Sequence, residues 1–582
     1  MPRHPIVRLV IASAVAVLSA AAARAQQFQE QSGVIPPGGA TTRFPQPDPL
    51  DYSNQLTIGD LDNDGDLDIV WANGGNFSTP GSPLVARIYI NNGSGVFTDE
   101  SAARGAVSGL FRGVELGDID NDGDLDIVLA PDFATAPRLL LNNGTGVFAD
   151  VSAARLPAMT LGSARAQFAD IDNDGDLDLY FVNGVTSRAG TGRGRLLLND
   201  GAGFFTEVTA TNTPNQTTAE PMDCIFADVD GDFDLDLRIS STAASQSKLY
   251  INNGAGVFSD GSGSVPADNN CYSYDFGDID GDGDLDMLGA NGSPVTANAE
   301  ILLRNNGAGL FTDISANLSP NPAQDDNDSK FLDYDMDGDL DLFIAHIGSG
   351  GEKIYSNNGA GVFTQVAGLI TVLSDTSLDI KVADLDNDGR YDLVTAQGES
   401  GSFRNRLYMN VTGPVDNRPP RIVATETLPS QPAGPASYVV RAAVLDDMTS
   451  DRNFFHKAME LRYTVNGGPE QIANMRYSGG QIYRGVIPPI NACGGLVQYY
   501  VRAVDWANNV AVGPTRTFTV AAGTQSGDIN ADTLVDAADA TLLVAVLVGI
   551  DTTPAHVARS DMDCSGQVNG DDVAPFVAAL FP

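Results

Sequence analysis

The chain has 582 residues, far more than one hydrophobic core holds, so two or more domains are expected. Its 75 acidic residues against 33 Lys and Arg give a formal net charge of −42. This charge argues against nucleic acid and anionic membrane surfaces as partners, because both would repel the protein. The 62 glycines and many Asp-rich turns favour a mainly all-β architecture.

The first residues are typical of a secretory signal peptide. Arg3 and Arg8 form a positive segment, Leu9 to Ala23 is apolar, and Ala23-Arg24-Ala25 fits a cleavage site. The alternative is an uncleaved membrane anchor, but the apolar run is short for a span, and no later stretch is long and apolar enough. We therefore expect residues 1–25 to be a signal peptide, and the mature protein to be soluble and exported, either secreted or at the surface of a bacterium.

One acidic loop pattern occurs seven times. The second copy reads Asp118-Ile-Asp120-Asn-Asp122-Gly123-Asp124-Leu-Asp126, and copies recur at intervals of 50 to 58 residues, which indicates a repeat architecture. Oxygen ligands at positions 1, 3 and 5, a turn glycine at position 6 and a later carboxylate describe a loop around a hard cation, and Ca²⁺ is the expected ion. The alternative is an Asp/Gly-rich turn that holds no metal, and seven copies in register argue against it.

A second signature follows each of the first six loops about 25 to 30 residues later. It runs from Asn91 to Phe97 in the first repeat and from Asn357 to Phe363 in the sixth. An Asn-Gly turn between β-rich runs predicts a hairpin. One repeat therefore contains four strands, two around the Asp loop and two around this turn, and four-stranded units repeated about an axis are the blades of a β-propeller.

The seventh repeat lacks its last strand, because the chain passes from Asn410 directly into Gly413-Pro414. The segment 28–32 resembles 97–101 and 148–152, so it supplies the missing outer strand. Residues 26–413 are thus predicted to form a seven-bladed β-propeller closed by the N-terminal strand. An open solenoid is the alternative, but it would not need a displaced strand.

These repeats resemble those of the FG-GAP/VCBS family, whose best-known member is the integrin α-subunit propeller. The resemblance implies that loop positions 1, 3, 5 and 9 bind the metal through side-chain oxygens and position 7 through its backbone carbonyl. It implies up to seven Ca²⁺ ions in the propeller. The residues implied are Asp60, Asp62, Asp64, Asp66 and Asp68; Asp118, Asp120, Asp122, Asp124 and Asp126; Asp170, Asp172, Asp174, Asp176 and Asp178; Asp228, Asp230, Asp232, Asp234 and Asp236; Asp278, Asp280, Asp282, Asp284 and Asp286; Asp333, Asp335, Asp337, Asp339 and Asp341; and Asp384, Asp386, Asp388, Arg390 and Asp392.

Two loops depart from the family pattern. Phe233 replaces the turn glycine of the fourth loop, and a bulky residue is poorly suited to positive φ, so this site is expected to be weak or empty. Arg390 occupies position 7 of the seventh loop, where a cation beside the metal should lower the affinity.

Variable loops at the opposite end of the repeats are the expected ligand-binding surface. They include residues 74–85, 184–194, 291–299 and 397–403, which are rich in Gly, Ser, Thr and Asn. Such loops suit a glycan or a polar protein surface, and plain connecting loops are the alternative.

Residues 414–523 lack the acidic loops of the repeats. Pro414, Pro419 and Pro420 mark a linker, and the alternating runs 437–444, 460–465 and 497–504 predict an Ig-like or fibronectin-III-like β-sandwich. Its expected role is that of a spacer, without chemistry of its own.

Residues 524–582 contain two further loops, each followed by an apolar run that predicts a helix, 540–548 and 573–580. The pair resembles a type I dockerin, which implies up to two more Ca²⁺ ions and a cohesin-like partner. Thr533 in place of the turn Gly and Ser565 in place of an Asp depart from that pattern. The implied ligands are Asp528, Asn530, Asp532, Asp536 and Asp539, then Asp561, Asp563, Ser565, Asn569 and Asp572.

No catalytic residue is predicted. The histidines are scattered, and paired carboxylates for glycoside hydrolysis cannot be picked from so many Asp residues. Cys224 and Cys271 could form a disulfide between neighbouring repeats or stay buried thiols. Two functions therefore compete: a calcium-binding adhesion or recognition protein, expected to be a monomer, and a polysaccharide-degrading hydrolase or a non-catalytic subunit of such a complex. The composition and motifs favour the first.

Overall fold

The computed structural model describes residues 26–33, 42–45, 51–76, 79–185, 187, 190–292, 299–348, 350–398, 403–431, 437–448, 456–490, 494–521, 527–562 and 567–581. The predicted signal peptide lies outside these ranges. Among the described helices, none is both long and apolar enough to span a membrane.

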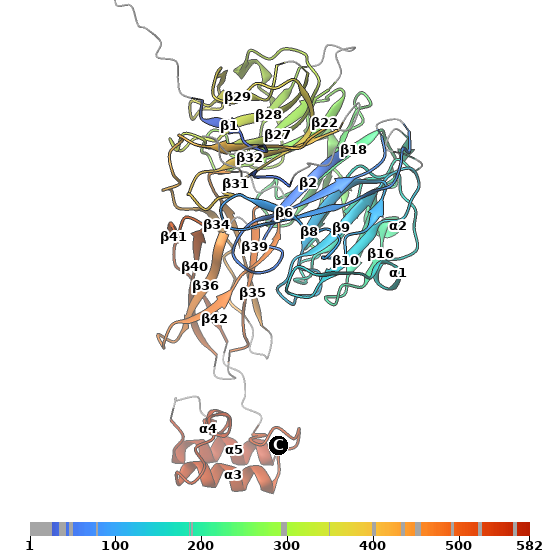
Figure 1. The fold of residues 1–582 in the computed structure, drawn as a ribbon. Coiled ribbons are helices and arrows are strands. Elements are labelled where there is room, and N and C mark those ends of the chain that lie inside the picture. Colours follow the sequence, from blue (N-terminus) through green and yellow to red (C-terminus); the bar gives the residue numbers. More distant parts are fainter. Residues whose placement is uncertain are drawn as a thin grey trace, which may run out of the picture.

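The described part of residues 51–410 is built from four-stranded antiparallel units (Figure 1). We number them as sheets one to seven in chain order. Their strands are β2 (Ser53–Gly59), β3 (Asp68–Asn73), β5 (Arg87–Asn91) and β6 (Phe97–Asp99); β8 (Phe111–Gly117), β9 (Asp126–Pro131), β10 (Arg138–Asn142) and β11 (Phe148–Asp150); β12 (Ala166–Ala169), β13 (Asp178–Phe181), β15 (Arg195–Asn199) and β16 (Phe205–Glu207); β18 (Pro221–Ala227), β19 (Asp236–Ser241), β20 (Lys248–Ile251) and β21 (Ser259–Asp260); β22 (Cys271–Gly277), β23 (Asp286–Asn291), β24 (Ile301–Arg304) and β25 (Thr312–Asp313); β27 (Asp326–Leu332), β28 (Asp341–Gly348), β29 (Lys353–Ser356) and β30 (Phe363–Gln365); and β31 (Asp375–Ala383), β32 (Asp392–Gln397) and β33 (Arg406–Asn410) with β1 (Phe28–Glu30).

Short elements decorate these sheets. They are the strand pairs β4 (Leu84–Val85) with β7 (Ser108–Gly109) and β14 (Thr191–Gly192) with β17 (Thr218–Ala219), the strand β26 (Leu318–Ser319) beside β30, and the one-turn helices α1 (Ser152–Arg155) and α2 (Thr209–Asn212). A further pairing between the ends of β28 and β31 joins sheets six and seven.

The two sequence signatures occupy equivalent places in the first six repeats, and the seventh has the Asp loop alone. The Asp loop joins the first and second strands, so that in sheet two Gly117 pairs with Asp126 across its base. The Asn-Gly turn joins the third and fourth strands, and its glycines, such as Gly144, adopt positive φ, which favours glycine. Asp loops and Asn-Gly turns therefore lie at one end of each sheet, and the variable loops lie at the other.

The sheets follow one another side by side. The first strands contact in the order β2, β8, β12, β18, β22, β27 and β31, and β31 in turn contacts β2. Strand β1 pairs with β33, with Phe28 opposite Asn410. One apolar cluster fills the space between each neighbouring pair of sheets; that between sheets seven and one contains Trp71, Val394 and Leu407. This part of the chain is mainly β and propeller-like.

The next module consists of two antiparallel sheets that face each other. One contains β34 (Arg421–Thr425), β35 (Tyr438–Leu445), β39 (Ile482–Ile487) and β38 (Arg476–Gly479); the other contains β37 (Gln471–Asn474), β36 (His456–Val465), β40 (Gly495–Asp505), β41 (Val510–Val512) and β42 (Arg516–Val520). Alternate residues of both sheets point inward, and Val440, Leu461, Tyr499, Val501 and Phe518 form the core.

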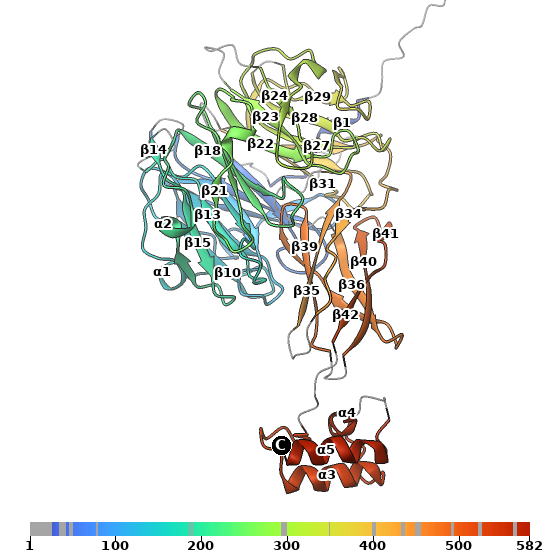
Figure 2. The same ribbon diagram turned by 180° about the vertical axis from the view of Figure 1, so that it is seen from behind.

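The C-terminal module is helical, with α3 (Ala537–Leu547), α4 (Pro554–Ser560) and α5 (Val573–Leu580). Ile529, Leu543, Met562 and Phe576 form its small core. Figures 1 and 2 both place these helices beyond the β-sandwich, at its end distant from the repeated sheets.

Candidate metal centres

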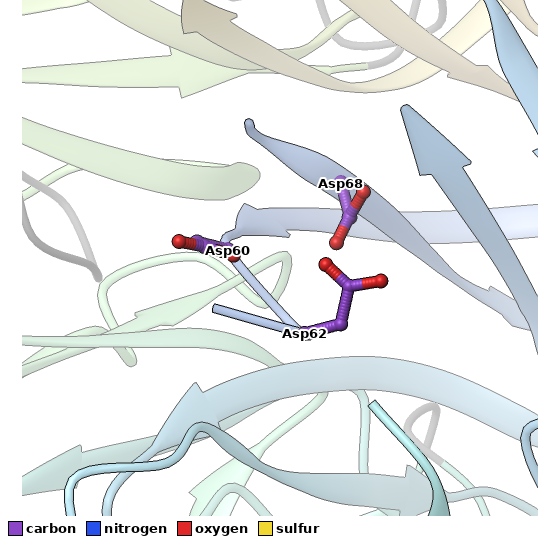
Figure 3. Close-up of side chains that lie close together, drawn as sticks. All are labelled: Asp60, Asp62 and Asp68. Atoms are coloured by element: carbon purple, nitrogen blue, oxygen red, sulfur yellow. The ribbon is translucent and has the colours of Figure 1, made fainter. Parts of the chain in front are cut away.

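Each Asp loop gathers its carboxylates around one point. In the first loop, ligand oxygens of Asp60, Asp62 and Asp68 lie within 4.8 Å of one another. Figure 3 shows the carboxylates of Asp62 and Asp68 facing each other, with Asp60 beside them. Equivalent groups form in the second to fifth loops. Carboxylate oxygens at this separation repel one another strongly unless a cation lies between them.

Backbone hydrogen bonds fix the first and last carboxylates of the loop. Asp60 accepts from the backbone N–H groups of Asp64 at 3.2 Å and Gly65 at 3.0 Å. Asp68 accepts from Leu61 at 3.0 Å and from Asn91 at 2.8 Å. The sequence folds the loop in this way because the turn glycine has a φ of 92°, which lets its N–H face the first Asp.

The carboxylate at position 3 carries an unsatisfied oxygen in loop after loop. In six loops Oδ1 of this residue is buried and accepts no hydrogen bond from the described residues; these are Asp62, Asp120, Asp172, Asp230, Asp280 and Asp386. A buried oxygen without a donor is costly and rare, and its repetition at one position calls for a common explanation. A cation in the loop would satisfy all six, so the donor set fits Ca²⁺.

The other oxygen of the same side chain is tethered in several loops. Arg104 pairs with Asp62 at 2.8 Å, Arg155 with Asp120 at 3.3 Å, and Arg43 with Asp386 at 3.2 Å. Each arginine therefore holds its carboxylate from one side and leaves Oδ1 directed into the loop.

Burial changes the electrostatics of the position-9 carboxylates. It raises the pKa of Asp68 and Asp126 to about 8, even though both accept backbone hydrogen bonds that act in the opposite direction. The same cause raises the pKa of Asp341 to about 9. In the absence of a cation these loops therefore carry more negative charge than they can stabilise.

The position-7 carboxylates point away from their own loops. Asp124 accepts from the Nδ2 of Asn63 at 2.8 Å, and Asp234 accepts from Asn173 at 2.9 Å. Each bond links one loop to the next sheet. The carboxylate at position 7 is therefore engaged outside its own loop, and binding of a metal through the position-7 carbonyl stays a prediction.

The first Asn of the Asn-Gly signature links consecutive loops. Asn142 donates through Nδ2 to the backbone carbonyls of Leu125, in its own loop, and Leu61, in the preceding loop. Asn91 makes the same pair of bonds to Leu67 and, across the first and last sheets, to Leu385. The two sequence signatures therefore form one hydrogen-bonded unit.

The fourth loop, whose site is predicted to be weak or empty, keeps the backbone geometry of the other loops. Phe233 adopts a φ of 69° and its N–H donates to Asp228 at 3.0 Å, as the turn glycine does elsewhere. Arg441 lies over the Phe233 ring, 5.6 Å from its centroid, and this packing helps to hold the strained residue. In the seventh loop, Arg390 pairs with Asp388 at 2.7 Å, so the expected positive charge does lie beside the loop.

The β-sandwich packs directly against the Asp loops, which sequence reasoning missed. Arg441 bonds Asp234 of the fourth loop at 2.5 Å, and Arg421 bonds Asp278 of the fifth. Arg418 lies 3.8 Å from Asp333 of the sixth. The enrichment of arginine among residues 418–484, in so acidic a chain, is the signal that could have indicated this contact.

The C-terminal loops contain part of their predicted ligand sets in described residues. The position-12 residue Asp539 is fully buried and accepts from the backbone N–H groups of Ile529 at 2.7 Å, Asn530 and Asp536. Asp532 and Thr533 both donate backbone N–H groups to Asp528. Thr533 has a φ of 75°, the conformation expected of the replaced glycine.

The second C-terminal loop is described only in part. Its residue Asn569 caps the following helical turn by accepting from Asp571 at 2.8 Å, and its backbone N–H donates to Asp572 at 2.7 Å. The predicted ligands Asp563 and Ser565 lie outside the described residues, as do parts of the four variable loops.

A charged cluster at the end of the sheets opposite the Asp loops was also missed. Asp326 contacts His346 at 2.7 Å and forms an ion pair with Lys353. Glu300 lies beside Asp326, and burial, followed by the interaction with that carboxylate, raises its pKa to about 10. Glu300 and Asp326 are 2% and 0% exposed. Their spacing of 26 residues in the sequence gave no sign that they would meet.

The cysteine alternatives are resolved for one pair. Cys224 and Cys271 are both buried and are not joined by a disulfide. Cys271 donates weakly to the backbone carbonyl of Ser273 at 3.1 Å. Cys493 and Cys564 lie outside the described residues.

Comparison with known proteins supports the repeat assignment. The model of the FG-GAP-like repeat matches residues 60–129, 118–181, 239–289 and 333–395. Three of these matches begin at the first Asp of a loop. The chain therefore contains FG-GAP-like repeats. No curated protein matches the sequence.

Among solved structures, the chain is similar to the polysaccharide lyase Uly1, with 12% identity and a TM-score of 0.35, over 66% of this chain and 98% of the lyase. It is also similar to a fructofuranosidase from Schwanniomyces occidentalis complexed with fructose, with 7% identity and a TM-score of 0.26, over 82% and 92% of the two chains. At these levels neither neighbour identifies the chemistry of this protein.

Proposed function

We propose that this protein is an exported calcium-binding recognition protein. In this proposal the repeats form a closed, integrin-like seven-bladed propeller whose Asp loops hold structural Ca²⁺ ions. The propeller binds a glycan or protein ligand, and the dockerin-like C-terminal module, with its own Ca²⁺ sites, attaches the protein to a cohesin-like or other partner.

The observation that carries the calcium assignment is the buried, unsatisfied Oδ1 at position 3, which recurs in six loops. Hard oxygen donors, a backbone-fixed first and last Asp, and several carboxylates per loop suit Ca²⁺ better than a soft metal. Because the ligands close around the ion from several sides, we assign the ions a structural role.

The engagement and burial of the acidic side chains favour recognition over catalysis. The Asp residues of the loops are engaged with the backbone, with arginines or with the proposed ions. One close acid pair outside them, Glu300 and Asp326, is buried. A polysaccharide-degrading hydrolase needs an accessible acid pair on either side of its substrate, and this pair does not offer one.

An array of polysaccharides and glycans tests the proposal. The full chain should be retained by at least one glycan in the presence of Ca²⁺ and lose that retention in EDTA, and no reducing ends should be released. Release of sugar would contradict the recognition function and favour the hydrolase. Absence of both retention and release would exclude a glycan and leave a protein as the ligand.

A further inference from the structure

We propose that the cleft between the Asp loops and the β-sandwich is an oligosaccharide-binding site, with Trp506 as its aromatic wall. This inference rests on the proposed recognition function and places its ligand at the end of the propeller opposite the variable loops.

The cleft consists of two adjoining cavities of about 620 and 360 Å³. Both lie between the repeated sheets and the sandwich, and they share Gly123, Leu125 and His456 in their walls. Ligand sites occur preferentially at domain interfaces, and each volume is within the range of small-molecule pockets. Two adjoining cavities suit an extended ligand such as a short sugar chain.

The walls of the cleft are fixed by direct bonds between the two modules. The backbone N–H of Asp170 donates to Ser478 at 2.7 Å, and that of Asp333 donates to Asp447 at 2.7 Å. Gln481 donates to the carbonyl of Asp228 at 2.9 Å. These bonds join the sandwich to the third, fourth and sixth loops, so the cleft exists without a ligand. A preformed cleft lowers the entropic cost of binding.

The first and seventh loops are left facing the larger cavity. Asp60 and Asn63 of the first loop and Asp384 and Asn387 of the seventh line its wall. Asp60 and Asp384 are engaged in their own loops, and Nδ2 of Asn63 and of Asn387 donates to a neighbouring loop. The amide oxygens of the two asparagines can accept hydrogen bonds from the hydroxyl groups of a sugar.

Trp506 supplies the apolar surface that such a ligand also needs. It lies in the turn after β40 and is 41% exposed, whereas the chain's other tryptophan, Trp71, is fully buried in the core. The turn is held by Asn509, whose N–H donates to Asp505 at 2.7 Å. An indole beside polar groups presents a flat face to the C–H side of a sugar ring.

The charges in the cavity favour a neutral sugar over an acidic one. Lys330 and Lys381 lie in the wall, but Lys330 pairs with Asp275 at 3.5 Å and Lys381 with Asp379 at 3.7 Å. Since these ammonium groups already face carboxylates and the loops are acidic, the cavity offers no net positive charge to an acidic polymer or peptide.

Intrinsic fluorescence tests the site, because Trp506 is the exposed one of two tryptophans. We expect titration of the full chain with neutral oligosaccharides of two to six units to give a saturable change with at least one series. Trp506→Ala should weaken that binding at least tenfold by isothermal titration calorimetry. Trp506→Phe, which keeps a ring, should retain more of the affinity. Leu496→Ala, which removes a side chain of similar exposure (44%) outside the cavity walls, is the matched control and should bind normally.

The results of these binding experiments distinguish a failure of the proposed cleft from a failure of the recognition function on which it rests. Glycan retention that survives Trp506→Ala would leave the recognition function standing and overturn the cleft as its site. Binding of acidic sugars or peptides alone would overturn the assigned ligand class. Failure of every oligosaccharide to bind the native chain would overturn the cleft together with glycan recognition.

Discussion

In excess EDTA the melting temperature of the full chain should fall by on the order of 10 °C or more. A ligand that binds only the folded state stabilises it by about 2.7 kcal/mol when its concentration is 100 times the dissociation constant. When several loops bind Ca²⁺, the stabilisation from each ion adds to that from the others. Removal of the ions would also leave the position-3 oxygens and the buried position-9 carboxylates without a counter-charge. Differential scanning calorimetry in Ca²⁺ and in EDTA measures this difference.

Circular dichroism during the same melts distinguishes the helical module from the sheets. The helical signal in circular dichroism follows α3–α5, whereas the strand signal follows the sheets. We expect both transitions to move, and excess Ca²⁺ to restore them. Melting curves that coincide with and without EDTA would contradict the calcium assignment.

The stability of the native chain should fall as the pH rises, and Glu300→Gln should reduce that fall. The pKa of Glu300 is raised from 4.5 to about 10 in the folded chain, so the folded state holds a proton that the unfolded state releases between these values. The contribution of Glu300 to stability is therefore present below about pH 4.5 and is lost as the pH rises toward the folded pKa. The slope for one such proton is about 1.4 kcal/mol per pH unit.

Glutamine keeps the shape of the side chain and carries no proton to lose. Urea unfolding between pH 5 and pH 9 should therefore show a gain for Glu300→Gln over the native chain that grows with pH. The charged groups around the site, Asp326, His346 and Lys353, are unchanged in the variant. Glu207→Gln, at an exposed position, is the control and should leave the slope unaltered. Parallel slopes for Glu300→Gln and the native chain would show that Glu300 is ionised in the folded state.

The repeated sheets could be predicted from the sequence because both signatures are local. An Asp loop and an Asn-Gly turn each specify a chain reversal within a few residues, and two such reversals at a known spacing define a four-stranded repeat. The FG-GAP-like match agrees with this prediction. The pairing of β1 with β33 follows from the likeness of residues 28–32 to the outer strands, since the last sheet lacks one of its own.

The contacts between modules could not be predicted in the same way. Arg441 meets Asp234 from 207 positions away in the sequence, and no local pattern encodes such a distance. The same holds for Glu300 and Asp326, whose meeting depends on two neighbouring sheets. Phe233 adopts the positive φ of the turn glycine that it replaces, although propensity alone disfavours this conformation for a bulky residue. The surrounding hydrogen bonds and Arg441 outweigh that preference.

The central claim, that the Asp loops are calcium sites, is tested most directly by counting ions. Elemental analysis of the desalted chain after exposure to Ca²⁺ should find several ions per molecule. Asp172→Ala, which removes the position-3 carboxylate of the third loop, should lower the count by one. Asp200→Ala, which removes a carboxylate from the adjacent Asn-Gly-type turn, should leave it unchanged. A chain that retains no calcium, or a count that Asp172→Ala does not alter, would contradict the account.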